Sequence, residues 1–206
     1  MQKIILIASV KGGVGKSTIA NILCNKLENS VILNLDPYQD AEDFNSARTI
    51  NILPHTNLPN IIEKLDEDFI ILDARSFLDE RLRTLDIDLF VFMTRVGYRS
   101  LKTTADSAVS LCMYNWAKSV LFLVNEVRNQ KEIDIAGGML SQMLEDLNSE
   151  NISFTSFAYS GAIKTLENRK VSISDLLAEG GLFRKTYAPI ETASLKLKNE
   201  ILELLR

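Results

Sequence analysis

A glycine-rich segment with two lysines is the part of the chain best suited to chemistry. Residues 9–18 read Ser-Val-Lys-Gly-Gly-Val-Gly-Lys-Ser-Thr and directly follow the apolar run at residues 4–8. A glycine-rich loop between a strand and a helix points several backbone N–H groups toward one position, where the start of the helix adds its positive end. Gly12, Gly13 and Gly15 let phosphate oxygens approach closely, because a Cβ would obstruct them. The segment therefore predicts a phosphate-binding loop.

Lys16 and Ser17 lie where this loop passes into the predicted helix. A lysine at that point reaches the β- and γ-phosphates of a nucleotide, and a serine hydroxyl there can bind Mg²⁺. Lys11 is a second lysine near the start of the loop. An ordinary glycine-rich turn does not explain this combination, so we expect a nucleoside triphosphate to bind here.

Two aspartates end buried apolar runs further along the chain. Asp36 follows the run at 31–35, and Asp73 follows the run at 69–72. The carboxyl ends of parallel strands meet at the edge of the sheet where α/β proteins place their ligands. From there Asp36 could orient an attacking water or hold the Mg²⁺ shell, although a helix N-cap or turn aspartate is the alternative. Asp73 has the position of a Walker B carboxylate, which contacts Mg²⁺, often through water.

Short strands and amphipathic helices alternate along the chain and must position these residues. Helical spacing of apolar residues is found at 19–27, 101–112 and 136–147. The alternation predicts a doubly wound α/β domain, a mostly parallel sheet with helices on both faces. The expected strands are 3–8, 31–35, 69–72, 89–93, 120–124 and 152–158, with a weaker edge strand at 49–53.

The composition narrows the class of protein. The 206 residues, 46% of them hydrophobic and 24% charged, suit one domain spanning 1–206 with a sizeable core. A net charge of −4 argues against a globally basic nucleic-acid binder, although it permits a local basic patch. Cys24 and Cys112 are isolated, and His55 is the single histidine, which excludes a multi-histidine metal site. With neither a secretory signal nor a bilayer-length apolar run, we expect a cytoplasmic protein.

The last segment, 191–206, is expected to form an amphipathic helix. Leu197, Ile201, Leu204 and Leu205 share one face, while the polar face mixes acidic and basic residues. A membrane-surface helix usually has a strongly cationic polar face. Packing onto the domain is therefore favoured over membrane attachment.

Residues 11–18, Lys-Gly-Gly-Val-Gly-Lys-Ser-Thr, resemble the deviant Walker A motif of the ParA/MinD ATPases. The strand ending in Leu35-Asp36-Pro37 and the strand ending at Asp73 resemble the next two motifs of that family. The resemblance extends over the whole chain in length and element order, but its specific motifs lie before residue 75. Because the loop starts at residue 11, the chain is most similar to short ParA-type partition ATPases without an N-terminal helix-turn-helix. The expected fold is the P-loop NTPase fold of the deviant Walker A type.

The resemblance implies a role for each residue of the site. Lys11 would reach the partner's nucleotide across an ATP-sandwich dimer, Lys16 would bind the β- and γ-phosphates, and Asp36 would position the hydrolytic water. Ser17 and Asp73 would hold Mg²⁺. The remaining contacts with ATP would come from Gly12, Gly13, Val14, Gly15, Thr18 at the α-phosphate, and Asn125 facing the adenine.

Three segments depart from the family pattern. Asn34 stands where the family often has an acidic residue, two positions before Asp36. Residues 74–77 read Ala-Arg-Ser-Phe in place of a turn with glycine or proline, so we expect slow or strongly partner-dependent hydrolysis. The segment 94–100 lacks the prolines of close short ParA proteins, so the dimer surface is expected to differ in detail.

A ParA-like protein would form an ATP-dependent homodimer that binds DNA nonspecifically and associates with the nucleoid. A small ParB-like centromere-binding protein would stimulate its hydrolysis, and no membrane is expected as a partner. Contacts with phosphates need positive charge but no base readout. The favoured DNA-binding residues lie in two groups that we expect to be free of nearby acids. These are Lys164, Arg169, Lys170, Arg184 and Lys185, with Arg95, Arg99 and Lys102 as further candidates.

Three other functions remain open at this stage. A MinD-like ATPase would position a complex at a membrane, and the polar face of the last helix argues against it. A metabolic P-loop enzyme would use ATP to activate a small substrate, and Lys11 disfavours it. A nucleotide-binding scaffold with little turnover is kept open by the unusual segment at 74–77.

Overall fold

A computed structural model describes residues 2–36, 47–74, 79–112, 117–145, 152–158, 160–163, 166, 169 and 171–206. Helices and strands alternate along this part of the chain, as expected for an α/β domain. The strands are β1 (Lys3–Ala8), β2 (Ser30–Asn34), β3 (Thr49–Asn51), β4 (Phe69–Asp73), β5 (Ile87–Arg95), β6 (Ala117–Val127) and β7 (Ile152–Ala158). The helices are α1 (Lys16–Cys24), α2 (Leu58–Ile62), the 3₁₀ helix η2 (Glu80–Thr84), α3 (Tyr98–Cys112), α4 (Gln130–Met143), α6 (Ile173–Ala178) and α7 (Gly181–Leu204).

The described strands form one seven-stranded sheet in the order β3-β2-β4-β1-β5-β6-β7, and every pair is parallel. The predicted fold class is confirmed. In a parallel sheet all carboxyl ends point to one edge, so β1 and its two neighbours, β4 and β5, bring residues 9, 74 and 96 to the same side. The weak run at 49–53 is indeed an edge strand, because β3 is the outermost member of the sheet.

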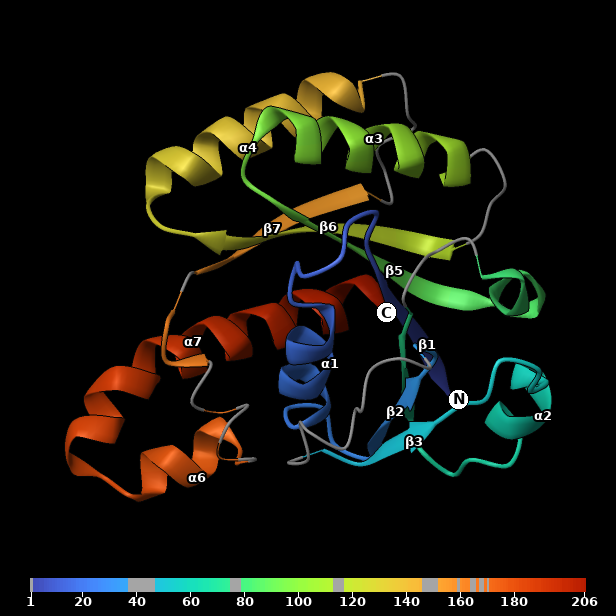
Figure 1. Ribbon diagram of the computed structural model, residues 1–206, viewed down its shortest axis with the longest axis horizontal. Helices are drawn as coiled ribbons and strands as arrows, with labels where there is room; N and C mark the ends of the chain where they lie inside the picture. The colour runs from blue at the N-terminus through green and yellow to red at the C-terminus, as the bar shows by residue number, and fades with distance from the viewer. Residues whose placement is uncertain are drawn as a thin grey trace.

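Helices cover both faces of the sheet (Figure 1), with α3 and α4 on one side and α1, α6 and α7 on the other. Successive side chains of β1 point to opposite faces of the sheet, so Leu6 packs with the α3–α4 layer and Ile5 with the α1–α6–α7 layer. Both side chains are fully buried, as expected for a strand between two helical layers. The apolar spacing at 101–112 and 136–147 is confirmed for Leu101 and Ala136, which are buried on the α3–α4 side.

The last helix is longer than the sequence predicts, because α7 begins at Gly181 and ends at Leu204. Leu197 and Ile201 are buried against the domain, so the predicted packing of this helix is confirmed. An ion pair of 2.6 Å between Lys26 and Glu191 also joins it to the segment that follows α1. Pro189 lies inside the helix. Among the described residues, no helix combines the length and the apolar character needed to cross a bilayer.

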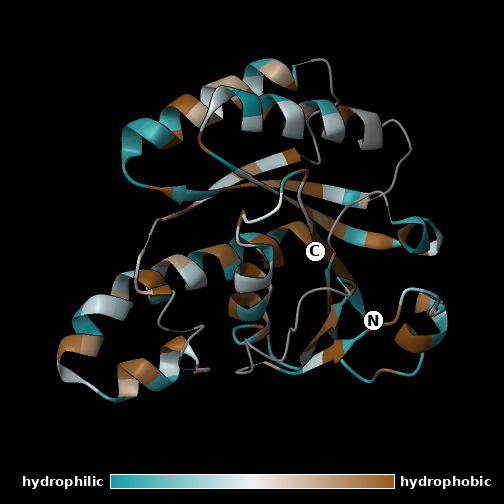
Figure 2. Cartoon of the chain, viewed as in Figure 1, coloured by the Kyte–Doolittle hydropathy of each residue, from teal (hydrophilic) through white to brown (hydrophobic). Residues whose placement is uncertain are grey.

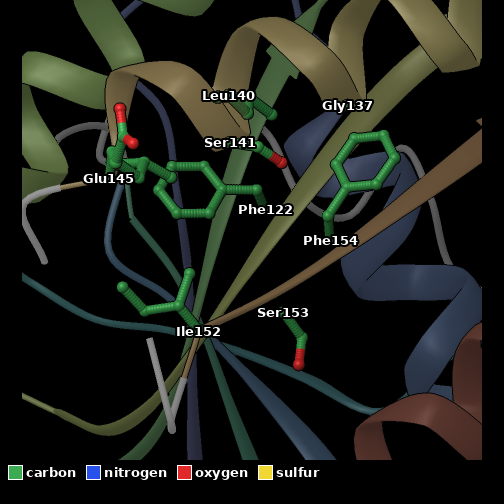
Figure 3. Close-up of a pocket in the computed structure, with 9 residues that line it drawn as sticks. Phe122, Gly137, Leu140, Ser141, Glu145, Ile152, Ser153 and Phe154 are labelled. Atoms are coloured by element: carbon green, nitrogen blue, oxygen red, sulfur yellow. The ribbon is translucent and has the colours of Figure 1, made fainter. Parts of the chain in front are cut away.

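A pocket of about 350 Å³ lies between the end of α4 and the beginning of β7 (Figure 3). Phe122, Leu140, Ile152 and Phe154 form much of its lining. Strands of a parallel sheet begin at the edge opposite to their carboxyl ends, so this pocket is remote from the loop at residues 9–15.

Candidate nucleotide-binding site

The glycine-rich loop connects the end of β1 at Ala8 to the start of α1 at Lys16. Gly13 and Gly15 have φ values of 71° and 91°, in the left-handed region that other residues rarely adopt. Gly15 is the N-cap residue of α1, and no side chain caps this helix end. The N–H groups in the first turn of α1 therefore remain available to an anion.

Side chains from two neighbouring strands hold the carbonyls of the loop. Asn125, buried near the end of β6, donates from Nδ2 to the Val14 carbonyl over 2.7 Å. Arg95, the last residue of β5, donates from Nη2 to the Gly13 carbonyl. A Cβ added to Gly15 would lie 2.5 Å from the Asn125 amide nitrogen. The glycine is thus required by its backbone angle and also by the space that Asn125 occupies.

Asp73 is the last residue of β4 and lies beside the loop, almost completely buried. Burial raises the pKa of its carboxyl, and the negative charge of Asp36 raises it further. A hydrogen bond from Ser17 and the positive charge of Lys16 act in the opposite direction but do not outweigh burial. None of the described residues hydrogen-bonds to its Oδ1. The structure thus brings Lys16, Ser17, Asp36 and Asp73 close enough together to interact, as the sequence predicted.

These residues suit Mg²⁺, which prefers carboxylate, hydroxyl and phosphate oxygens. The hydrogen bond between Ser17 and Asp73 places a hydroxyl and a carboxylate oxygen side by side, at the loop that would bind the phosphates. The unpartnered Oδ1 of Asp73 is costly to bury and would gain a partner from a bound cation or its water shell.

Asp36 lies two residues beyond the end of β2, which ends at Asn34. The buried Asn34 side chain accepts from the Asp36 N–H over 3.1 Å and donates to Asn51 Oδ1 over 2.9 Å. Arg81 in η2 donates to the Leu35 carbonyl over 3.3 Å. Asn34, which departs from the family pattern, therefore fixes the backbone that presents Asp36.

Lys11 and Lys16 differ in their surroundings. Lys16 is half-buried at the start of α1, whereas Lys11 is exposed and donates from Nζ to Ser100 Oγ at 3.3 Å. The hydroxyl of Ser9 donates to the Lys11 carbonyl over 2.6 Å, which holds the backbone while the lysine side chain extends outward. Thr18 is half-buried one residue after Ser17.

The favoured DNA-binding residues, in the groups at 164–170 and 184–185, lie away from the loop or outside the described residues. Arg184 and Lys185 are exposed in the first turns of α7. Arg169 forms an ion pair of 2.8 Å with Glu179 and lies 5.3 Å from the ring centre of Phe183. The expectation that its group has no nearby acid was therefore wrong for Arg169. Lys164 and Lys170 lie outside the described residues, as does the atypical segment 75–77.

Sequence reasoning missed several residues that shape this site. Arg95 was expected on a DNA-binding surface but contacts the phosphate loop, and its partner Glu126 was not considered. The only available signal was position, because both residues lie at the carboxyl ends of strands.

The general phosphate-loop pattern has a glycine five residues before Gly15, where this chain has Val10. The loop therefore follows the double-lysine pattern alone.

No protein-family model matches the chain, and no curated protein sequence matches it either. Several solved structures do share its architecture. The MinD cell division protein of Aquifex aeolicus has a TM-score of 0.59 at 17% identity, covering 95% of this chain and 96% of its own. A putative plasmid partition protein from Borrelia burgdorferi B31, bound to AMPPNP, has a TM-score of 0.60 at 17% identity, with 95% and 99% covered.

A ParA family ATPase from Chlorobium tepidum TLS has a TM-score of 0.61 at 15% identity, covering 90% of this chain and 96% of its own. Identities this low establish likeness of fold. The matches nevertheless extend over nearly all of both chains, so the likeness is not limited to the phosphate loop. The chain therefore has the fold of the ParA and MinD ATPases, the family that its double-lysine loop resembles.

Proposed function

We propose that this chain is a ParA-like partition ATPase, a single domain that dimerises with ATP and binds DNA nonspecifically. Cycles of binding and hydrolysis would segregate or position plasmid or chromosomal DNA, or another cargo. The observation that carries the proposal is the exposed Lys11 on a loop whose base holds Lys16, Asp36 and Asp73. The fold of known ParA and MinD proteins supports it.

Nucleotide binding would use the backbone of the loop and three side chains. The N–H groups of residues 12–16 surround the phosphates, and Lys16 neutralises the β- and γ-phosphates. Thr18 contacts the α-phosphate, and Asn125 closes the site toward the adenine. Mg²⁺, held by Ser17 and Asp73, would neutralise charge that develops on the phosphate oxygens. Asp36 would orient the attacking water, because Asn34 holds its backbone at the open edge of the sheet.

Lys11 would couple ATP to dimerisation. Its side chain is exposed, and the 3.3 Å hydrogen bond that it donates to Ser100 lies at the surface. Breaking such a contact is inexpensive, so the ammonium group is free to reach a nucleotide bound by a second copy of the chain. Since only the triphosphate offers γ-oxygens, a cation supplied in trans favours the dimer in the ATP state.

Dimerisation would double the number of cations facing DNA and so raise avidity. Arg184 and Lys185 are the described residues best placed for this role, because both are exposed in the first turns of α7. Hydrolysis would dissolve the dimer and release the DNA. A small ParB-like protein bound to the cargo would accelerate this step.

Membrane positioning is the second candidate, and the likeness to MinD favours keeping it. The apolar stripe of α7 is buried against the domain, however, which leaves it unavailable to lipid. A third candidate, an enzyme that activates a small substrate with ATP, would show turnover that depends on that substrate and not on DNA.

Sedimentation with nonspecific duplex DNA at one moderate salt concentration tests the proposal. We expect the protein to pellet with DNA in the presence of ATP and Mg²⁺ and to stay in the supernatant with ADP. Anionic liposomes in place of DNA test the membrane alternative. Binding to neither in any nucleotide state would overturn the partition function.

A further inference from the structure

The guanidinium of Arg95 links the phosphate loop to the end of a neighbouring strand. Its Nη2 donates to the Gly13 carbonyl and, over 2.8 Å, to Glu126 Oε1. Glu126 lies in β6 next to Asn125, where the pairing with β7 shifts register between Val124 and Val127. The loop, β5 and β6 are thereby joined through one side chain.

Glu126 is held in an unusual backbone conformation. Its φ is 61°, in a region that a glutamate rarely adopts, and it occurs inside a strand. The irregularity turns the carboxylate toward Arg95, as bulges near functional sites often re-aim a side chain. Neither residue belongs to the double-lysine motif or to the two aspartate motifs.

We propose that Arg95, oriented by Glu126, is a positioning residue that sets the phosphate-binding shape of the loop. The inference deepens the proposed ATPase function and rests on it. Since the peptide bond is planar and trans, fixing the Gly13 carbonyl on one side turns the Val14 N–H to the other. Asn125 does the same for the next peptide unit by holding the Val14 carbonyl. Together the two side chains fix two successive loop N–H groups for phosphate oxygens.

A second observation agrees with a role at the nucleotide site. The Nε of Arg95 is buried, and none of the described residues accepts a hydrogen bond from it. An arginine that served only as a surface ion pair would be expected to keep this donor in water. The guanidinium therefore retains an unused donor next to a loop built for anions.

The test compares nucleotide binding by the wild type and four variants, without DNA. Arg95→Ala removes the donor, Arg95→Lys keeps a positive donor, and Glu126→Gln keeps an acceptor but removes the charge that orients Arg95. Lys131→Ala is the matched control, since Lys131 is exposed in the first turn of α4 and its removal also deletes one positive charge. Affinity for a fluorescent ATP analogue, KM, kcat and unliganded melting temperature are measured for each.

We expect Arg95→Ala to weaken binding of ATP and ADP about tenfold and to raise KM similarly, with kcat within about twofold of the wild type. Arg95→Lys should recover most of the affinity, Glu126→Gln should lose about threefold, and Lys131→Ala should bind like the wild type. Unchanged affinity in Arg95→Ala, or an equal loss in Lys131→Ala, would overturn the assignment. If Arg95→Ala does not fold, Glu126→Gln decides, and unchanged affinity there also overturns it.

The proposed function fails in a different way from this inference. A wild type that binds no ATP analogue with Mg²⁺ would refute the ATPase function itself. Wild-type binding that is lost in Lys16→Ala but unaffected by changes at Arg95 and Glu126 would leave the ATPase function intact and refute the role of Arg95.

Discussion

The phosphate loop and the N-terminal end of α7 both offer positive charge to anions, but they are built in opposite ways. At the loop, side chains from β5 and β6 hold two backbone carbonyls, and a buried carboxylate lies beneath them. We call the N-terminal end of α7, residues 181–185, the α7 tip. Leu182 is 79% exposed there, and Arg184 and Lys185 beside it are also exposed. Figure 2 shows hydrophobic and hydrophilic segments mixed where α6 meets α7.

This difference teaches how each region can discriminate between ligands. Rigid donors at fixed positions select one arrangement of phosphate oxygens, so the loop suits a ligand of defined geometry. Exposed lysine and arginine side chains impose no geometry, and they suit a polyanion that is recognised by charge alone. Changes to the loop backbone, or to the side chains that hold it, should therefore alter nucleotide affinity, and changes at the α7 tip should alter only the proposed salt-dependent contact with DNA.

The largest effect is expected from Lys11→Ala, which removes the one exposed loop cation without disturbing the loop. Among the described residues, Lys11 makes a surface hydrogen bond to Ser100 and no ion pair, so nucleotide affinity of the monomer should stay within about twofold, as for other exposed contacts. ATP-dependent dimerisation should be lost completely. Analytical ultracentrifugation with a slowly hydrolysed ATP analogue measures it, and a dimer of unchanged affinity would contradict the role in trans.

Gly15→Ala tests the packing of the loop itself. Its Cβ would lie 2.5 Å from the Asn125 amide, at a φ of 91° that disfavours any side chain. We expect nucleotide affinity to fall about 100-fold, equivalent to about 3 kcal/mol. Gly138→Ala is the matched control, because a Cβ there meets nothing within 4 Å, and it should stabilise α4 by about 0.5–1 kcal/mol. Calorimetric titration with ATP and thermal unfolding give both quantities.

The double variant Arg184→Ala/Lys185→Ala tests the α7 tip. In the ATP state, DNA affinity should fall about tenfold. The slope of the logarithm of the DNA-binding constant against the logarithm of salt concentration should become less steep by about one to two. Lys196→Ala, on the same helix but paired with Glu200, should have little effect. Fluorescence anisotropy at several salt concentrations separates the variants. An unchanged salt slope in the double variant would move the DNA surface elsewhere.

Asp88→Asn, at the edge of the sheet opposite to the loop, should have the smallest effect on either region. Its buried carboxylate accepts from the Ile4 N–H at 2.9 Å and from Lys118 at 3.0 Å. Burial acts to raise the pKa of Asp88, but these hydrogen bonds and the charges of Lys118 and Lys3 outweigh it and lower the pKa. Nucleotide binding by the variant should be unchanged.

The lowered pKa of Asp88 gives the sign of its pH dependence. The ionised group stabilises the folded state above its unfolded pKa of about 3.9, and this stability is lost as the pH falls through the lower folded value. At pH 7 the free energy of unfolding of the wild type should exceed that of Asp88→Asn by about 1–2 kcal/mol. This difference should shrink below about pH 4. Urea unfolding at several pH values measures it; a difference that grows toward acid pH would show the opposite sign.

Much of the fold could be predicted because it depends on local patterns. Apolar runs located all seven described strands, and β1 and β7 have the predicted limits. The loop, Asp36 and Asp73 could be found because parallel strands bring their carboxyl ends to one edge. Arg95 and Glu126 could not, since their contact depends on the register of β5 with β6 and on the positive φ of Glu126. The ion pair of Arg169 depends equally on how α6 meets the preceding segment.

Pro189 has a consequence for how the protein opens. A proline has no N–H to donate to the carbonyl four residues earlier, so the turns of α7 before it are joined less firmly to the rest. Residues 181–186 are exposed, whereas Ile190, Leu197 and Ile201 are buried. Hydrogen exchange should therefore divide this helix into two cooperative units, a first part that opens locally and a second that opens only with the core. The cations of the first part can then adjust to an uneven partner surface while the core stays folded.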